Sequence, residues 1–447
     1  MSEHQKQRAE HKALWDEVVK AGGPRKYVES QLRERGLWVE RQDVLSMGAK
    51  EKSAYIERVK AEEAVRHPLQ AEVWAAYTAL HIVHLGEDIF WQGDVSVDFY
   101  DADRLEDRLA QRNLPEIETP DQLCEAMELS LGELRWLCYH REASKTLHYR
   151  PFTIPKKSGG ERQIWAPMPK LKAAQHWVLR NIAERLTVHG AAHGFIPGRS
   201  IYTNALEHID ASVVVSLDLA DFFPTFTFKR VKGIFRQAGY LDGIATLLAL
   251  LCTEAPREEV EYDGERYFIA LGDRCLPQGS PASPALTNAA CLRLDRRLMG
   301  FAEKYGWRYT RYADDLTFSL PSDRGADAPD ISDQIKQLLG AARAIVEGEG
   351  LKLRADKTHI MRPNRRQKVT GLVVNGADQP RTPREMRRRV RAMIHNLKRG
   401  KGLHDGESFA HLTGLIAFIH MTDPERGRSL LAQLGELRAE PQSEAAH

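Results

Sequence analysis

Apolar residues recur at helical spacing over the first part of the chain. Between Glu51 and Trp91 they follow one another at intervals of three and four, with Pro68 as the expected break. From about residue 93 the pattern is irregular and acidic, until Thr119-Pro120-Asp121 supplies a residue triplet typical of a new helix start. This pattern predicts a helical N-terminal extension over residues 1–120.

Short β-like runs joined by turns follow. In HYRPFTIPKKSGGERQIWAP two such runs flank the turn Ser158-Gly159-Gly160, which predicts a hairpin that carries cations. A helix is expected from Lys170 to Leu186, then the strand SVVVSLDL, and strands alternate with helices to about residue 375. The segments TPREMRRRVRAMIHNL and FAHLTGLIAFIH are helical again. The alternation of strands and helices predicts a mixed α/β or α+β domain.

Composition excludes several classes of protein. With 42% hydrophobic and 28% charged residues, the chain is neither disordered nor membrane-like. No apolar run approaches the roughly 18–20 residues of a spanning helix, and the start lacks a signal-peptide core. We therefore expect a soluble, intracellular protein with no membrane partner. Its five cysteines are scattered, which predicts reduced core thiols.

A basic segment is hidden by the small net charge of +2. Residues 381–401 hold nine cations and the single anion Glu385; the cations are Arg381, Arg384, Arg387, Arg388, Arg389, Arg391, Lys398, Arg399 and Lys401. Such a cluster suits contact with a phosphate backbone, because bound cations release counterions. A solvated helix face is the alternative.

Two adjacent carboxylates, Asp314 and Asp315, lie between the β-rich runs WRYTRY and LTFSL. The flanking runs predict a hairpin with the pair at its turn. Adjacent carboxylates repel each other unless a cation lies between them, and hard oxygen ligands favour Mg²⁺. An Asp-Asp pair also fits a solvated loop, so by itself it is weak evidence for a metal site.

Asp218 ends the apolar run SVVVSLDL, where a charge is costly without a partner. If this strand neighbours the hairpin, Asp218 joins Asp314 and Asp315 in a three-carboxylate site. Such a site can hold two Mg²⁺ ions about 3.5–4 Å apart, the arrangement used in nucleotidyl transfer. Asp221, three residues later, is expected to point away from the pair and to be structural.

The segment CLPQGSPASPALTNAACLRLDRRL predicts a tight turn that enters a helix near Ser283. Small residues such as Gly279 and Ser280 let the backbone approach a base pair and present N–H groups to phosphates. Alone these are ordinary turn and cap residues. Beside the carboxylates they indicate a nucleotide site.

The order SLDLADFF, PQGSPASP, YADD resembles the motif order of reverse transcriptases, over roughly residues 125–435. The resemblance implies an α+β right-hand polymerase with fingers, palm and thumb. Together with the helical N-terminal extension (1–120), the expected parts are the fingers with the start of the palm (121–215), the palm with an interleaved fingers segment (216–375), and a basic helical thumb with a C-terminal tail (376–447).

The same resemblance implies residue roles. Asp218, Asp314 and Asp315 would bind the catalytic Mg²⁺ ions, and Lys357 matches a lysine that acts as general acid toward pyrophosphate, with a solvated turn lysine as the alternative. The residues implied for nucleotide binding are Lys156 or Lys157 and Arg162 for the triphosphate, Phe223 under the incoming sugar, and Gln278, with Gly279, for the incoming nucleotide or the template base.

Two shorter segments resemble those of retron reverse transcriptases: NALEH, from Asn204 to His208, and VTG, comprising Val369, Thr370 and Gly371. This likeness implies a dedicated structured non-coding RNA as template, priming from a guanosine 2′-hydroxyl, a branched RNA-linked single-stranded DNA (msDNA) as product, and a role in anti-phage defence. The residues expected to contact RNA are Asn204, His208, Val369, Thr370, Gly371, Arg384, Arg387, Arg388 and Arg391. For His208 a capping or core role is the alternative.

The implied partners are the RNA, its RNA/DNA duplex, dNTPs and a separate effector or toxin, with RNase H supplied by another protein. The N-terminal extension is expected to hold RNA or dock a partner. Two alternatives are a group II intron-like or other defence-associated reverse transcriptase, and an RNA-binding scaffold whose catalysis has lapsed. The presence of all three aspartates, Gln278 and Lys357 argues against the scaffold.

Overall fold

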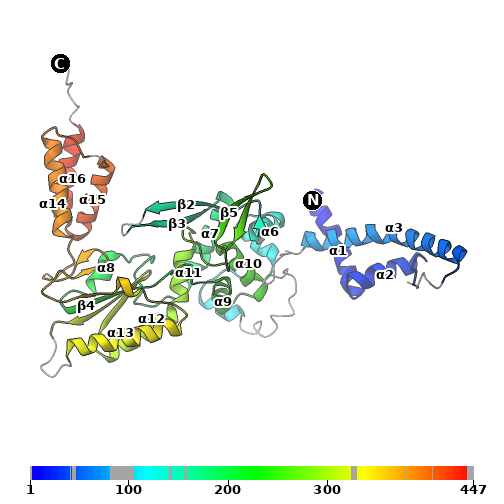
Figure 1. Ribbon diagram of the computed structural model, residues 1–447, viewed down its shortest axis with the longest axis horizontal. Helices are drawn as coiled ribbons and strands as arrows, with labels where there is room; N and C mark the ends of the chain where they lie inside the picture. The colour runs from blue at the N-terminus through cyan, green and yellow to red at the C-terminus, as the bar shows by residue number, and fades with distance from the viewer. Residues whose placement is uncertain are drawn as a thin grey trace, which may run out of the picture.

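The computed structural model describes residues 3–40, 42, 47–80, 105–139, 143–155, 159–323, 330–376, 378–404 and 406–439. Three helices form the N-terminal extension, which projects to one side of the other described elements (Figure 1): α1 (Glu3–Lys20), α2 (Pro24–Glu34) and α3 (Ala49–Leu80). The break expected at Pro68 is wrong, because α3 runs through it. Val65 and Leu69, on either side of the proline, both pack into the small core of this extension, which holds the helix together.

Short helices and two small sheets build the next part of the chain. Thr119 and Ser130 begin two helices, and each forms a reciprocal capping box. The helix start at Thr119 was predicted from the sequence. The helices are α4 (Leu105–Gln111), α5 (Pro120–Met127), α6 (Leu131–Cys138), α7 (Pro169–Asn181), η4 (Ala183–Arg185) and α8 (Ile201–Leu206).

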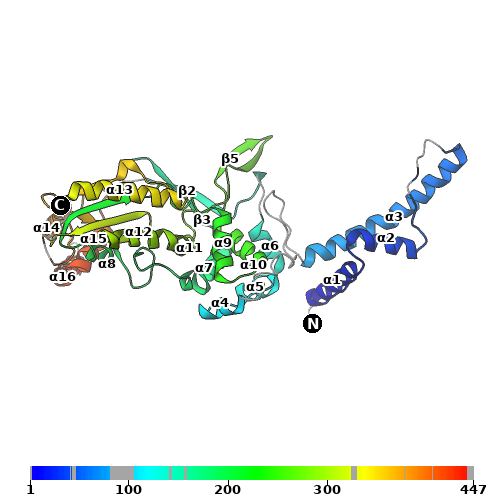
Figure 2. The ribbon, with the colours of Figure 1, turned by 90° about the horizontal axis from the view of Figure 1, so that it is seen from below.

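The predicted hairpin over residues 149–167 is present as β2 (Tyr149–Pro155) paired with β3 (Glu161–Pro167). A second hairpin, β5 (Arg257–Tyr262) and β6 (Glu265–Ala270), pairs with β1 (Ala143–Ser144) and projects from the body of the molecule (Figure 2). Its two strands are mostly exposed. Four further helices complete this region: α9 (Phe228–Ala238), α10 (Asp242–Cys252), α11 (Ser283–Ala290) and α12 (Leu292–Lys304).

A four-stranded antiparallel sheet lies at the centre of the fold, in the order β7-β8-β4-β9. Its strands are β4 (Ala211–Asp218), β7 (Arg308–Tyr312), β8 (Asp315–Pro321) and β9 (His359–Met361). Alternate residues of β4 enter two cores: Val213 and Val215 pack with α12 and α13 (Ile331–Gly348), whereas Val214 packs with α8 on the other face. The sheet is therefore covered on both faces, and its functional groups lie at strand ends.

The C-terminal part is a three-helix bundle: α14 (Arg384–Lys398), α15 (Phe409–Thr422) and α16 (Pro424–Ala439). Its core includes Val390, Ile394 and Ile416. Between the sheet and this bundle lie η5 (Ala355–Lys357) and the short hairpin of β10 (Lys368–Val369) and β11 (Leu372–Val373).

All five cysteines are buried thiols, as predicted. Among the described residues, the helices are too short or too polar for any of them to cross a lipid bilayer.

Candidate active site

The three predicted aspartates meet at one end of the central sheet. Asp218, the last residue of β4, is the register partner of Asp315, the first residue of β8. Ala313 and Asp314 form the turn between β7 and β8, and Ala313 has the left-handed φ of 56°. The Asp314 carbonyl accepts a hydrogen bond of 2.9 Å from the Leu219 N–H, which fastens the turn to the end of β4.

Asp218 is buried and lies beside two cations. Lys357 Nζ donates to Asp218 Oδ2 at 2.8 Å, and Arg354 Nε lies 3.8 Å from Asp218 Oδ1. In the described structure Asp218 Oδ1 has no hydrogen-bond partner although it is buried. The Arg354 N–H also donates to the Asp218 carbonyl at 2.8 Å, which holds η5 against the strand end. The sequence did not single out Arg354, although it stands three residues before Lys357.

The other two carboxyl groups hold their protons more tightly than usual. Burial, followed by the charges of Asp314 and Asp218, raises the pKa of Asp315 to about 6. Burial and then the charge of Asp218 raise the pKa of Asp314. Ionising all three groups together is costly unless a cation shares them. Within the described residues no three His, Cys, Asp or Glu side chains converge closely enough to hold a metal ion as placed. Asp218 faces Lys357 instead.

Replacing Asp315 with asparagine is expected to raise the stability of the metal-free protein at neutral pH. The pKa of Asp315 is about 6 in the folded state and about 3.9 in the unfolded state. The protonated carboxyl therefore adds its full stabilisation below about pH 4, and this stabilisation is lost as the pH rises through about 6. In a metal chelator, Asp315→Asn should melt at a higher temperature than the unsubstituted chain at about pH 7.5 and show no advantage near pH 3.5. Equal melting at neutral pH would contradict the raised pKa.

A cavity of about 1190 Å³ opens in front of the sheet end. Asp218, Asp314 and Lys357 line it from the sheet side. The predicted nucleotide residues that line it from the other elements are Arg162 of β3, Phe223 and Gln278. The Arg162 charge acts on Asp314 and opposes the rise of that pKa. Asp221, expected to be structural, also lines the cavity. Lys156 and Lys157 lie outside the described residues.

The Pro-Gln-Gly turn packs tightly against β3. The Trp165 N–H donates to the Gln278 carbonyl at 2.7 Å. Gly279 has φ 118°, and a Cβ there would lie 2.7 Å from the Trp165 carbonyl oxygen. Gly279 is therefore required by the close approach of the turn to β3, and it is Gln278 beside it that lines the cavity.

The segments NALEH and VTG contact each other, and most of their side chains are buried. Asn204 is 1% exposed and Val369 2%. Asn204 Nδ2 donates to Thr370 Oγ1 at 3.4 Å, and Thr370 Oγ1 donates to the Ile201 carbonyl at 3.1 Å. The RNA contacts expected of Asn204 and Val369 are corrected here, because these side chains join α8 to the β10–β11 hairpin. Gly371 is exposed, with a left-handed φ of 89°.

The RNA contact expected of His208 is also corrected, in favour of the core role. Its side chain is fully buried. Nδ1 lies 2.7 Å from Ser319 Oγ, and Nε2 lies 2.7 Å from Thr310 Oγ1. Burial, then the charge of Arg308, lowers the pKa of His208 to about 3, so the ring is neutral. The histidine connects α8 to β7 and β8.

Substituting His208 with leucine is expected to leave two buried hydroxyls without their present partner and to cost about 1–3 kcal/mol of stability. The affinity of the folded protein for RNA should not change, because the side chain is inaccessible. Thermal unfolding combined with RNA binding measured well below the melting temperature checks both parts. A loss of RNA affinity without a loss of stability would contradict the core role.

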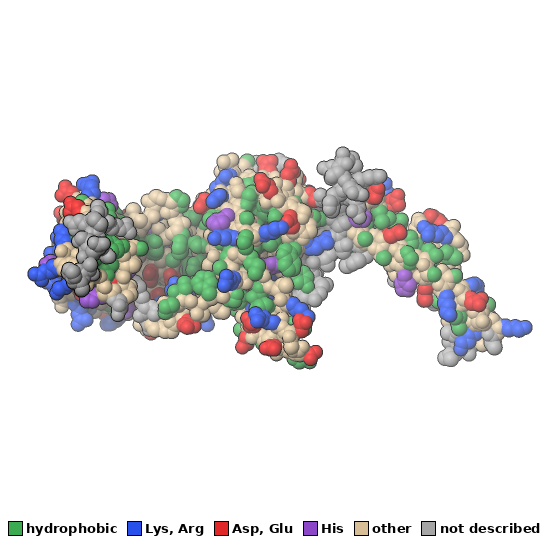
Figure 3. Space-filling model, turned by 90° about the horizontal axis from the view of Figure 1, so that it is seen from above, with side chains coloured by type: hydrophobic (Ala, Val, Ile, Leu, Met, Phe, Trp, Pro, Cys, Tyr) green, Lys and Arg blue, Asp and Glu red, His purple; other side chains and the backbone are tan. Residues whose placement is uncertain are grey.

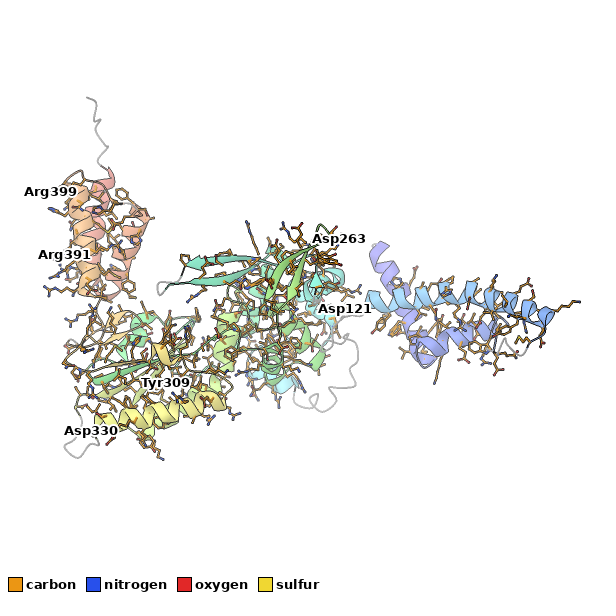
Figure 4. The ribbon with its side chains drawn as sticks, in the orientation of Figure 1. Asp121, Asp263, Tyr309, Asp330, Arg391 and Arg399 are labelled. Atoms are coloured by element: carbon orange, nitrogen blue, oxygen red, sulfur yellow. The ribbon has the colours of Figure 1, made fainter. Side chains whose placement is uncertain are left out.

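Cations gather on the C-terminal bundle (Figure 3), and Arg391 and Arg399 point away from it (Figure 4). Arg384, Arg388 and Arg391 are exposed along α14. Arg387 is half-buried, and its pKa is lowered by burial and then by the nearby charge of Arg426. Arg389 pairs with Glu407 at 2.9 Å. The exposed face of α14 therefore presents most of the predicted cations to solvent.

A buried ion pair behind the turn of Asp314 was not predicted. Arg311 Nε and Nη2 donate to the two carboxylate oxygens of Asp295 at 2.9 and 2.7 Å, and both side chains are 0% exposed. Arg311 Nη1 donates to Asn288 Oδ1 at 3.0 Å and to the Ala313 carbonyl at 3.2 Å. Tyr309, labelled in Figure 4, belongs to β7 like Arg311, and its hydroxyl donates to Asp295 Oδ1 at 2.8 Å. This network holds the turn that carries Asp314.

The sequence is similar to those of known reverse transcriptases. Residues 154–374 match the family model described as reverse transcriptase (RNA-dependent DNA polymerase). The chain is 48% identical to the retron Mx162 reverse transcriptase of Myxococcus xanthus, over 96% of this chain and 90% of that protein. It is 43% identical to the retron Mx65 enzyme of the same organism, over 73% of each chain.

It is also 33% identical to the retron Ec86 reverse transcriptase of Escherichia coli, over 74% of this chain and 92% of that one. The match to the first relative includes nearly all of the chain and so extends into the N-terminal extension. The chain belongs to the retron reverse transcriptase family and is therefore an RNA-directed DNA polymerase that depends on divalent metal ions.

Proposed function

We propose that this enzyme copies a dedicated structured non-coding RNA, starting from the 2′-hydroxyl of a guanosine in that RNA, into branched RNA-linked single-stranded DNA. The observation that carries the proposal is the cavity at the sheet end. It brings Asp218 and Asp314 together with Arg162, Phe223 and Gln278, which come from four segments of the chain. A polymerase site needs this combination of carboxylates, a phosphate-binding cation, a surface under the sugar and a polar contact for the base.

Asp218, Asp314 and Asp315 are the proposed ligands of two Mg²⁺ ions. Their oxygens are the donors that Mg²⁺ prefers, and the buried Asp218 Oδ1 lacks a hydrogen bond in the described structure. When bound, the ions would supply the charge that activates the priming hydroxyl and stabilises pyrophosphate. An ion bound there would compete with Lys357 for the negative charge of Asp218.

Lys357 is placed to serve the leaving group. Its side chain is 38% exposed and lines the cavity, so the ammonium released by Asp218 can donate a proton to pyrophosphate. Across the cavity, Arg162 holds the triphosphate, with Lys156 or Lys157 as further expected contacts. Phe223, half-buried with its ring 5.5 Å from that of Phe222, lies under the sugar and disfavours ribonucleotides.

The exposed cations of α14 are proposed to bind the phosphates of the RNA stem or of the RNA/DNA duplex. When Arg384, Arg388 and Arg391 are all replaced with glutamine, RNA binding is expected to weaken. The slope of log affinity against log salt concentration should fall in magnitude by up to about 2–3, because three phosphate contacts are lost. Binding titrations at several salt concentrations measure this slope. Arg389, paired with Glu407, offers a matched control as Arg389→Gln, with a smaller effect on the slope. An unchanged slope in the triple variant would contradict the contact.

We further propose that the enzyme works in the bacterial cytoplasm as part of an anti-phage module with a separate effector or toxin, and that another protein supplies RNase H. The helical extension of α1 to α3 would hold RNA or dock that partner. Deleting residues 1–80 should weaken RNA binding or partner recovery. If both stay unchanged, the extension serves neither purpose.

Sequencing the nucleic acid that copurifies with the protein tests the proposed function. Short DNA joined to RNA through a 2′–5′ branch, released by a debranching enzyme, is the expected result. Linear cDNA of varied sequence would indicate a different reverse transcriptase activity, such as that of a group II intron-like enzyme. RNA with no DNA would indicate a binding scaffold.

A further inference from the structure

Phe195 presents an aromatic ring to the catalytic cavity from a backbone conformation that aromatic residues rarely adopt. Its φ is 60°, in the left-handed region, where glycine or asparagine is favoured. The segment before it, residues 191–194, is buried, whereas Phe195 is 50% exposed and lines the cavity. Burial of the ring therefore does not explain why a phenylalanine occupies this strained position.

The loop that carries Phe195 is fastened to the catalytic hairpin. The His193 N–H donates to the Arg311 carbonyl at 2.8 Å, and the Arg311 N–H donates to the Ala191 carbonyl at 2.8 Å. Asn288 Nδ2 donates to the Gly194 carbonyl at 2.8 Å. These bonds come from β7 and α11, the same elements that support the turn of Asp314.

Gly194 touches the turn itself. A Cβ on Gly194 would lie 2.7 Å from the Ala313 backbone nitrogen and 3.3 Å from the Tyr312 carbonyl carbon. The next residue, Phe195, is therefore held at a fixed position relative to Asp314. Its ring centroid lies 6.4 Å from that of Tyr312, at an interplanar angle of 40°, so the Tyr312 ring supports the Phe195 ring, which lines the cavity.

We propose that Phe195 is a stacking residue for a nucleobase of the primer–template duplex at the catalytic turn. The inference rests on the proposed polymerase site, whose cavity it shares. A phenyl ring offers no hydrogen bond, so it cannot read sequence, but every base has a π-face that stacks on such a ring. A rigid ring beside Asp314 would hold the end of the duplex in register with the aspartates, whatever sequence is copied.

Replacing Phe195 with glycine separates stacking from a structural role. Glycine adopts the left-handed conformation freely, so Phe195→Gly should fold with an unchanged or higher melting temperature. We expect its affinity for a defined RNA template annealed to a DNA primer to fall about 10-fold, because one base–aromatic stack is lost. Phe195→Tyr keeps the ring and should bind as the unsubstituted chain does. Tyr262→Gly, which removes a 73% exposed ring outside the cavity, is the matched control and should leave binding unchanged.

A scan of abasic positions identifies the base. Single abasic sites are placed along the template or the primer near the 3′ end, and affinity is measured for the unsubstituted chain and for Phe195→Gly. One abasic position should weaken the unsubstituted chain but not the glycine variant, and its strand tells whether the stacked base belongs to the template or to the primer. Unchanged affinity of Phe195→Gly, or equal losses in both proteins at every position, would overturn the proposal. Failure of the polymerase site itself would appear separately, as DNA synthesis retained by aspartate variants.

Discussion

Substituting Asp314 and Asp315 together with asparagine is expected to lower the rate of DNA synthesis by at least about 10³-fold while RNA binding persists. The two residues lie at the turn and the first position of β8, and Asp315 pairs in register with Asp218. Asparagine preserves the shape of each side chain but removes its negative charge. The variant therefore loses the charge that a divalent cation needs, with little change in the backbone of the turn.

Single-turnover incorporation of one dNTP on a supplied primer–template measures this effect, and filter binding measures the RNA affinity. Asp263→Asn is a suitable control, because Asp263 is an exposed residue of the β5–β6 turn with a left-handed φ of 54° that asparagine tolerates. Synthesis at the unsubstituted rate in the double variant would show that catalysis occurs elsewhere.

Replacing Arg311 with methionine is expected to destabilise the protein by about 3–5 kcal/mol, because Asp295 would remain as a buried charge without its cation. Both side chains are 0% exposed and share two hydrogen bonds. A loss of this size is a large fraction of the roughly 5–15 kcal/mol that stabilises a folded domain. Chemical denaturation, with hydrogen exchange of the β7 amides as a local measure, tests the prediction.

The double substitution Arg311→Met with Asp295→Leu supplies the control. It removes both charges, so it should recover a substantial part of the stability lost in Arg311→Met. DNA synthesis should not recover to the same extent, because Arg311 Nη1 also donates to the Ala313 carbonyl beside Asp314. If Arg311→Met alone were as stable as the unsubstituted chain, the proposed role of the ion pair would be contradicted.

The meeting of the three aspartates could be predicted from the sequence because it depends on local patterns. Asp218 ends an apolar strand, and Asp314 and Asp315 lie between two β-rich runs, so a sheet that pairs these strands brings the carboxylates together, as the register shows. The Phe195 conformation and the Arg311–Asp295 pair could not be predicted in this way. They depend on contacts between residues far apart in the chain, which neither spacing nor composition reveals.

The short segments NALEH and VTG, which resemble family markers, predicted residue roles less reliably than the aspartate motifs predicted the position of the carboxylates. Asn204, His208 and Val369 were expected to contact RNA, yet all three are buried between α8, the central sheet and the β10–β11 hairpin. Similarly, a proline predicts a helix break from local geometry alone, and Pro68 lies inside a helix whose flanking residues pack into a core. In both cases tertiary packing, rather than local sequence, decided the outcome.

The most direct test of the account is a structure of the enzyme with RNA template, a chain-terminated primer, dNTP and Mn²⁺, whose anomalous signal locates the metal. The account predicts metal bound between the carboxylates of Asp218, Asp314 and Asp315, with Lys357 Nζ moved from its present 2.8 Å contact with Asp218 toward the triphosphate. Metal bound elsewhere, with the contact between Lys357 and Asp218 intact, would contradict it.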